Sequence, residues 1–93
     1  IGWTPLHEAS IAGFYKTANE LLKAGADVNC KGSEQVTPIQ DAVKEGHYEV
    51  AELLLWYGAD PLLKNEKGKC ALDEATDQHM RKLLESYITK SRR

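Results

Sequence analysis

The feature that most constrains the fold of this chain is an internal repeat with a period of 33 residues. Thr-Pro-Leu at residues 4–6 returns as Thr-Pro-Ile at 37–39, and Gly-Ala-Asp at 25–27 returns at 58–60. A third, degraded copy begins near Gly68. It is shortened, because the leucine pair of its second helix, Leu83 and Leu84, comes earlier than the period requires. A fixed period of this length is typical of a stacked array, in which each unit buries its apolar face against its neighbours.

Each copy predicts a helix, a turn, a second helix and a hairpin. Threonine is a good cap for the first helix, and proline in the first turn loses no hydrogen bond. In the first copy Gly13 ends this helix, Leu21 and Leu22 give the second helix an apolar face, and Gly25 stops it. The spacing predicts repeats over about residues 1–32, 33–65 and 66–89, followed by a basic tail at 90–93.

Composition and charge exclude several functions. The chain has 28% charged and 42% hydrophobic residues and a net charge of −2, which is typical of a soluble globular domain and not of a nucleic-acid binder. No apolar run approaches the roughly 20 residues that a membrane span needs. Cys30 and Cys70 have no companion ligands at zinc spacing. The sequence suggests no Ser/His/Asp or Cys/His combination and contains no phosphate-binding glycine loop or metal motif. We therefore expect no enzyme activity, no cofactor, no metal, no direct nucleic-acid binding and no membrane partner.

The motifs Thr-Pro-Leu-His-Glu-Ala at 4–9, Gly-His-Tyr-Glu-Val-Ala-Glu-Leu-Leu-Leu at 46–55 and the repeated Gly-Ala-Asp resemble the ankyrin repeat over nearly the whole chain. The resemblance implies an all-α ankyrin repeat solenoid with two full repeats and a shortened C-terminal capping repeat. It also implies a protein-interaction module, which we expect to be monomeric. The first copy lacks a polar cap, so we expect at least one further repeat before Ile1.

An acidic row is the strongest candidate for a binding site. Glu8, Asp41 and Glu74 recur every 33 residues, so stacking should align them across neighbouring first helices. Three aligned acids repel one another, which favours a role in binding a cation, although chance placement on a solvated face is the alternative. By helical spacing the same face carries Ile11, Ala12, Lys44, Glu45, Asp77 and Gln78.

Two tryptophans stand at positions where the repeat does not require an aromatic residue. Trp3 is replaced by Val36 and Lys69 in the other copies, so it is a candidate partner anchor beside the acidic row. Packing against an upstream repeat is the alternative. Trp56 and Tyr57 end the second helix of the middle copy, and we expect them to pack against the shortened third copy. A second partner surface there is the minority interpretation.

Histidines are expected to be structural. His7 belongs to the Thr-Pro-Leu-His element and should bond the threonine and nearby backbone, as Gln40 should in the second copy. His47, in a Gly-His pair, should also be structural, and His79 should be solvated.

The run GWTPLHEA, followed by TPIQDA, resembles a nuclear ankyrin subgroup of the BARD and Tonsoku type. The nearest likeness is to the factor that localises the SMC repair complex, or to a related meiotic ankyrin protein. In this subgroup the groove takes an unmethylated lysine of the histone-four tail into an acidic pocket. Trp3, His7, Glu8 and Asp41 match its motif, whereas Ile11 and Ala12 replace residues that are generally asparagine and a polar or aromatic side chain.

Two functions follow from the resemblance. The first is a reader of the histone-four tail in a nuclear protein of chromatin or DNA repair. The second is a scaffold that binds another protein of a repair or recombination complex through an apolar groove containing Ile11, Trp3, Ser33, Glu34 and Val36. The predicted partner-binding residues are Trp3, His7, Glu8, Ile11, Asp41, Glu45, Glu74 and Asp77.

Overall fold

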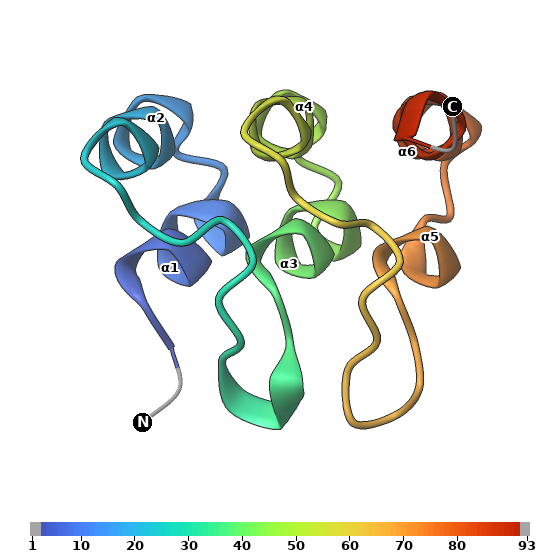
Figure 1. Ribbon diagram of the computed structural model, residues 1–93, viewed down its shortest axis with the longest axis horizontal. Helices are drawn as coiled ribbons and strands as arrows, with labels where there is room; N and C mark the ends of the chain where they lie inside the picture. The colour runs from blue at the N-terminus through green and yellow to red at the C-terminus, as the bar shows by residue number, and fades with distance from the viewer. Residues whose placement is uncertain (1–2, 92–93) are drawn as a thin grey trace.

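Three pairs of helices stand side by side in the computed structural model, which describes the backbone of residues 3–91 and the side chains of residues 3–89 (Figure 1). The helices are α1 (Pro5–Ala12), α2 (Tyr15–Lys23), α3 (Pro38–Lys44), α4 (Tyr48–Trp56), α5 (Ala71–Glu74) and α6 (Gln78–Ser91), with a short 3-10 turn, η1 (Ser33–Gln35). The described residues contain no strand. The predicted stack of helix pairs is confirmed.

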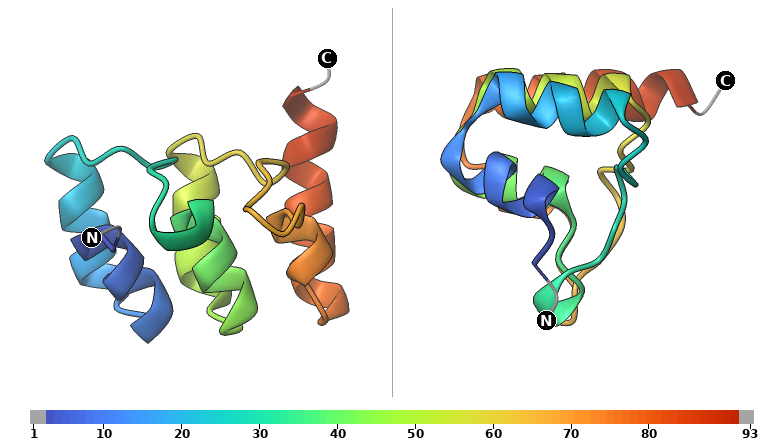
Figure 2. Two further views of the ribbon diagram at one scale, coloured as in Figure 1. Left: turned by 90° about the horizontal axis from the view of Figure 1, so that it is seen from below. Right: turned by 90° about the vertical axis from the view of Figure 1, so that its left-hand side faces the viewer.

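The molecule has an L-shaped cross-section. Seen along the stack, α2, α4 and α6 form an outer layer, α1, α3 and α5 form an inner layer, and the two hairpins project away from both (Figure 2, right). The inner helices pack on one another in the order α1, α3, α5, and the outer helices in the order α2, α4, α6. The angle between the inner helices and the hairpins is the concave side of the molecule.

The helix α1 begins and ends as its sequence predicts, whereas the Thr37 hydroxyl at the start of α3 makes no capping hydrogen bond. The Thr4 hydroxyl accepts a hydrogen bond from the His7 backbone N–H at 3.2 Å, and Pro5 occupies the first turn. Gly13 takes a left-handed conformation with φ 78° and ends α1. Gly46, with φ 77°, follows α3 in the same way.

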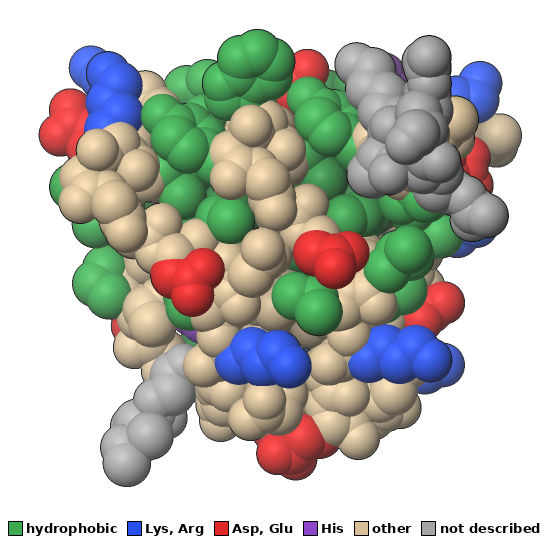
Figure 3. Space-filling view, in the orientation of Figure 1, with side chains coloured by type: hydrophobic (Ala, Val, Ile, Leu, Met, Phe, Trp, Pro, Cys, Tyr) green, Lys and Arg blue, Asp and Glu red, His purple; other side chains and the backbone are tan. Residues whose placement is uncertain are grey.

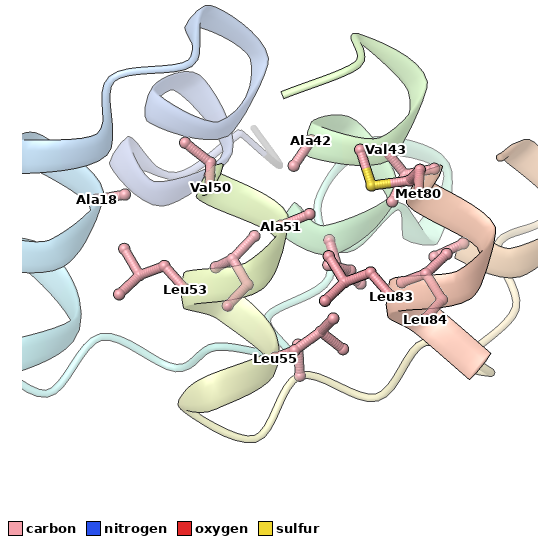
Figure 4. Packing of buried hydrophobic residues seen from close by; sticks show 14 of the residues in the cluster. Ala18, Ala42, Val43, Val50, Ala51, Leu53, Leu55, Met80, Leu83 and Leu84 are labelled. Carbon is pink, nitrogen blue, oxygen red and sulfur yellow. The ribbon is translucent and has the colours of Figure 1, made fainter. Parts of the chain in front are cut away.

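Small and branched apolar side chains fill the space between the two layers. Ala18, Ala42 and Ala51 are fully buried, and their size lets neighbouring helices approach closely. Met80, Leu83 and Leu84 of α6 belong to the same buried core as Val50 and Leu53 of α4 (Figure 4), so the shortened third copy still completes the core. Burial of this shared core, and not the stability of any one helix pair, holds the stack together.

The third copy departs from the predicted helical face. Its first helix, α5, has four residues, and Ala75 then takes an extended conformation with ψ 116°. Asp77 therefore lies in the connection before α6, so the prediction that it shares a helical face with Glu74 is wrong. The cause is the shortened sequence, which starts α6 early and puts His79 where the middle copy has Gly46. At the far end α6 continues to Ser91, and residues 92–93 of the predicted basic tail lie outside the described residues.

The prediction about the packing of Trp56 is corrected. Trp56 was expected to pack against the third copy, yet its side chain is 77% exposed, and hydrophobic atoms stand out over α4 in the space-filling view (Figure 3). It points outward because the turn of helix that precedes it already fills the core with Leu53, Leu54 and Leu55. His79 is exposed, as predicted, and one face of its ring stacks on Tyr48 with centroids 4.3 Å apart.

Candidate functional site

His7 fastens the first hairpin to the inner layer. Its ring is fully buried, with Nε2 2.7 Å from the Val36 carbonyl oxygen and Nδ1 2.9 Å from the Thr4 hydroxyl. The Thr4 backbone N–H donates to Nδ1 at 3.3 Å, so Nε2 carries the proton and donates it to Val36. Burial lowers the pKa of His7, and the bond to Val36 opposes this change. The expected structural role is confirmed, and the buried ring offers no surface to a partner.

Gln40 performs the equivalent task one copy later. Its amide Nε2 donates to the carbonyl oxygens of Leu63 at 2.8 Å and Lys69 at 3.1 Å, which fastens the second hairpin. In the third copy the same register position is Asp73, which accepts hydrogen bonds from the backbone and thiol of Cys70. These two bonds, the backbone one first, lower the pKa of Asp73.

His7→Ala should lower the free energy of unfolding by about 1–3 kcal/mol, because it leaves buried groups at Thr4 and Val36 unsatisfied. His7→Gln should lower it less, since an amide serves this position in the middle copy. Chemical denaturation of both variants beside the wild type measures the difference. Equal losses would mean that the amide cannot reach Val36 and that only the imidazole geometry fits here.

A pocket of about 230 Å³ lies in the angle between the hairpins and the inner helices. Of the predicted site residues, Trp3, Asp41 and Glu74 line it together. Glu8, Ile11, Glu45 and Asp77 are exposed but do not line it. The acidic row is therefore brought together in part, by Asp41 and Glu74, with Trp3 beside them.

Asp41 is the most unusual group in this pocket. Its side chain is only 7% exposed, and its Oδ2 atom has no hydrogen-bond partner among the described residues. Burial raises the pKa of Asp41 to about 7, with a lowering by nearby Lys44 and a further raising by Glu45. The carboxyl group is thus buried and close to its midpoint of ionisation at neutral pH, and one of its acceptor atoms is buried without a donor from the described residues.

The burial of Asp41 follows from its place in the stack. Its helix, α3, packs between α1 and α5, so both sides of this register position are covered. Glu8 occupies the same position on α1, which packs on α3 alone within the described inner layer, and its side chain is exposed. The sequence spacing makes the two acids equivalent, but their environments differ.

Trp3 stands at the rim of the pocket. Its side chain is 47% exposed, and its ring meets the His7 ring edge-on with centroids 5.1 Å apart. The buried and hydrogen-bonded imidazole therefore supports the indole at a position where it lines the pocket and remains partly exposed.

Glu34 was predicted only as part of the scaffold groove, and Lys67 on the second hairpin was missed in the sequence-based prediction. Glu34 and Lys67 line the pocket from neighbouring hairpins and lie 33 residues apart, as do the acids of the row. The backbone N–H of Glu66 donates to the Glu34 carbonyl at 2.9 Å and ties the two tips together. Extending the register of the repeat to the hairpin tips would have found this pair. Lys44, on α3, also lines the pocket, which therefore carries both signs of charge.

Ile11 lies away from the pocket, near the end of α1. Its side chain is 39% exposed, and its carbonyl oxygen accepts a hydrogen bond from His47 Nε2 at 3.0 Å. His47 thus joins the second copy to the first, which confirms its predicted structural role.

Other site classes find no support in the part of the chain that the structure describes. It holds no group of three or more histidine, cysteine, aspartate or glutamate side chains placed to bind a metal ion. Cys30 and Cys70 are both free thiols. None of the described helices is long and apolar enough to span a membrane.

Comparison with known proteins agrees with this architecture. Residues 1–65 match the family model described as ankyrin repeats (3 copies). Over 89 residues, or 96% of its length, the chain is 66% identical to the human protein named ankyrin repeat domain-containing protein 31, of which the match spans about 5%. The finer likeness to the BARD and Tonsoku subgroup stays a prediction. Ankyrin repeats generally form non-enzymatic surfaces that bind protein partners. The helix pairs, the fastened hairpins and both matches lead to one conclusion: the chain belongs to the ankyrin repeat family.

Proposed function

We propose that the concave pocket binds an unmethylated lysine of an extended peptide, and that this peptide is the tail of histone four. The observation that carries the proposal is the buried Asp41 carboxyl group with its unpartnered Oδ2 atom. A lysine ammonium brings both the charge and the hydrogen-bond donors that this atom lacks. The parent protein would then act in the nucleus, in chromatin or DNA repair.

The surroundings of Asp41 support a single lysine at this point. Glu74 adds a second carboxyl group, and the exposed part of Trp3 can cover the aliphatic stem or the ammonium of the ligand. Lys44 and Lys67 line the same pocket and would repel further positive charge close by. The favoured peptide therefore carries one lysine at Asp41, with its other basic residues further along the groove.

A scaffold function is the second candidate, and one observation favours it. Ile11 and Trp3 are both substantially exposed on elements of the inner layer, as a surface for an apolar partner would be. In this case the partner is another protein of a repair or recombination complex. The two functions differ in their response to salt, because pairing between charges weakens as ionic strength rises whereas apolar contact does not.

Titration with histone-four tail peptides tests the proposal. The unmodified peptide should bind, and dimethylation or trimethylation of the lysine should weaken binding, because it adds bulk and removes ammonium donors. Binding should also weaken at high ionic strength. Calorimetry at matched salt measures all three effects. Equal binding of methylated and unmethylated peptides, or no binding of either, would refute the lysine pocket.

Trp3→Ala should weaken peptide binding with little change in the unfolding midpoint. Phe14→Ala is the control, because it removes an aromatic side chain that is 60% exposed and does not line the pocket. If Trp3→Ala lowers stability and leaves binding intact, the indole serves packing and the pocket loses its aromatic member.

A further inference from the structure

A second cleft, of about 350 Å³, lies on the outer layer of the stack, away from the concave pocket. Its walls come from all three outer helices, with Tyr15 on α2, Trp56 on α4 and Tyr87 on α6. Tyr57, directly after α4, adds a fourth aromatic ring. The proposed lysine pocket shares no residue with this cleft, so the two sites can be tested separately.

The rings are exposed where the core does not require them. Trp56 is 77% exposed, Tyr15 is 44% exposed and Tyr57 is 37% exposed, so much of their surface faces solvent. In the first copy Trp56 and Tyr57 are replaced by Lys23 and Ala24, so the repeat itself does not demand aromatic residues here. A cluster of large exposed rings around a concave surface is typical of a binding site.

The charged side chains that line this cleft are all acidic. Glu49 and Glu52 line it, both are exposed, and none of the lining residues is lysine or arginine. Glu49 and Glu52 are one turn apart on α4, and Trp56 follows Glu52 by one further turn. Two carboxylates and an indole therefore share one helical face, next to rings from the neighbouring helices.

We propose that this outer cleft binds an arginine side chain presented by a protein partner. A guanidinium is planar, so it can stack on the exposed indole or phenol rings while its edge donates to the carboxylates. A lysine ammonium has no flat face, and a neutral side chain lacks the charge that Glu49 and Glu52 would pair with. The combination of aromatic faces and carboxylates on α4 selects arginine over both.

Nuclear magnetic resonance titration of the whole chain tests the site. The probes are short capped glycine peptides that carry a single arginine, a single lysine or a single citrulline. The arginine peptide should shift the Trp56 indole N–H resonance in a saturable way. The citrulline peptide, which keeps the shape and loses the charge, should bind at least about fivefold more weakly. The affinity of the lysine peptide should lie between those of the arginine and citrulline peptides.

Variants locate the binding. Trp56→Ala should lower the affinity for the arginine peptide at least about fivefold, and so should the double variant Glu49→Gln with Glu52→Gln. The resonances of the α4 backbone amides report the binding in each variant. Trp3→Ala and Asp41→Asn alter the concave pocket and should leave the affinity for the arginine peptide unchanged. The double glutamine variant keeps the aromatic rings, so it tests the charge even if Trp56→Ala disturbs folding. Absence of saturable binding, equal binding of arginine and citrulline, equal binding of arginine and lysine, or no effect of the α4 variants would overturn the proposal.

Discussion

Asp41→Asn is expected to raise the free energy of unfolding at about pH 8 and to change it little at about pH 4. Burial raises the pKa of Asp41 to about 7, whereas the unfolded chain has the ordinary value of 3.8. The folded protein therefore retains a proton that the unfolded chain releases. The stability associated with the protonated group is fully present below about pH 4 and is lost as the pH rises through about 7.

The expected size of this effect is large for one side chain. Each pKa unit corresponds to about 1.4 kcal/mol, so the shift of Asp41 corresponds to as much as ~4 kcal/mol above neutral pH. Asparagine has nearly the same shape and cannot ionise, so the variant escapes this loss. Thermal unfolding at both pH values measures it, with the exposed Glu8→Gln as the control at the same register position. If Asp41→Asn changes stability equally at both pH values, Asp41 has no raised pKa in the folded protein.

The same substitution should act on binding in the opposite direction. Removing a charge-assisted partner of a lysine should weaken peptide binding by about 1.5–3 kcal/mol. The wild-type affinity should itself fall by up to about tenfold per pH unit below pH 7, because the ammonium requires the ionised carboxylate. A variant that is more stable and binds less well at pH 8 would mark Asp41 as a group retained for binding. Unchanged affinity would refute its role in the pocket.

Gly13→Ala is the second change with a large expected effect. Gly13 has φ 78°, and a Cβ atom there would lie 2.6 Å from Nδ1 of His47. A residue with a Cβ atom in the left-handed region costs about 1–2 kcal/mol. Forcing the His47 ring aside adds about 1–3 kcal/mol and disrupts its hydrogen bond to the Ile11 carbonyl.

Gly46→Ala provides the matched control. Gly46 has nearly the same φ, 77°, but a Cβ atom there meets nothing within 4 Å. It should therefore show the conformational cost alone, and chemical denaturation of both variants isolates the contribution of the contact with His47. Equal losses would mean that His47 moves away freely and that its bond to Ile11 adds nothing to stability.

The period of the sequence predicts the helix pairs and the threonine cap of α1, because these depend on residues close in the chain. The resemblance to the repeat family adds the structural roles of His7 and His47, whose bonds reach distant residues. The period also predicts which residues occupy equivalent positions. It does not predict that Asp41 is buried while Glu8 is exposed, since that difference depends on how many neighbours each helix has. The brevity of α5 and the outward direction of Trp56 escaped prediction for a related reason. The brevity of α5 depends on the shortened length of the third copy. The direction of Trp56 depends on the leucines before it, which already fill the core.

The hydrogen bonds of His7 and Gln40 redefine where one module of this protein ends. Each donates from an inner helix to carbonyl groups of the hairpin that follows it, which places Val36 with the first copy and Lys69 with the second. Boundaries drawn by the sequence period cut through these bonds. The cohesive blocks instead run from one capping threonine to the residue before the next, over 4–36 and 37–69. A chimera between related arrays would preserve every such bond if its junction were placed directly before the threonine, and would break one if it were placed before the hairpin tip.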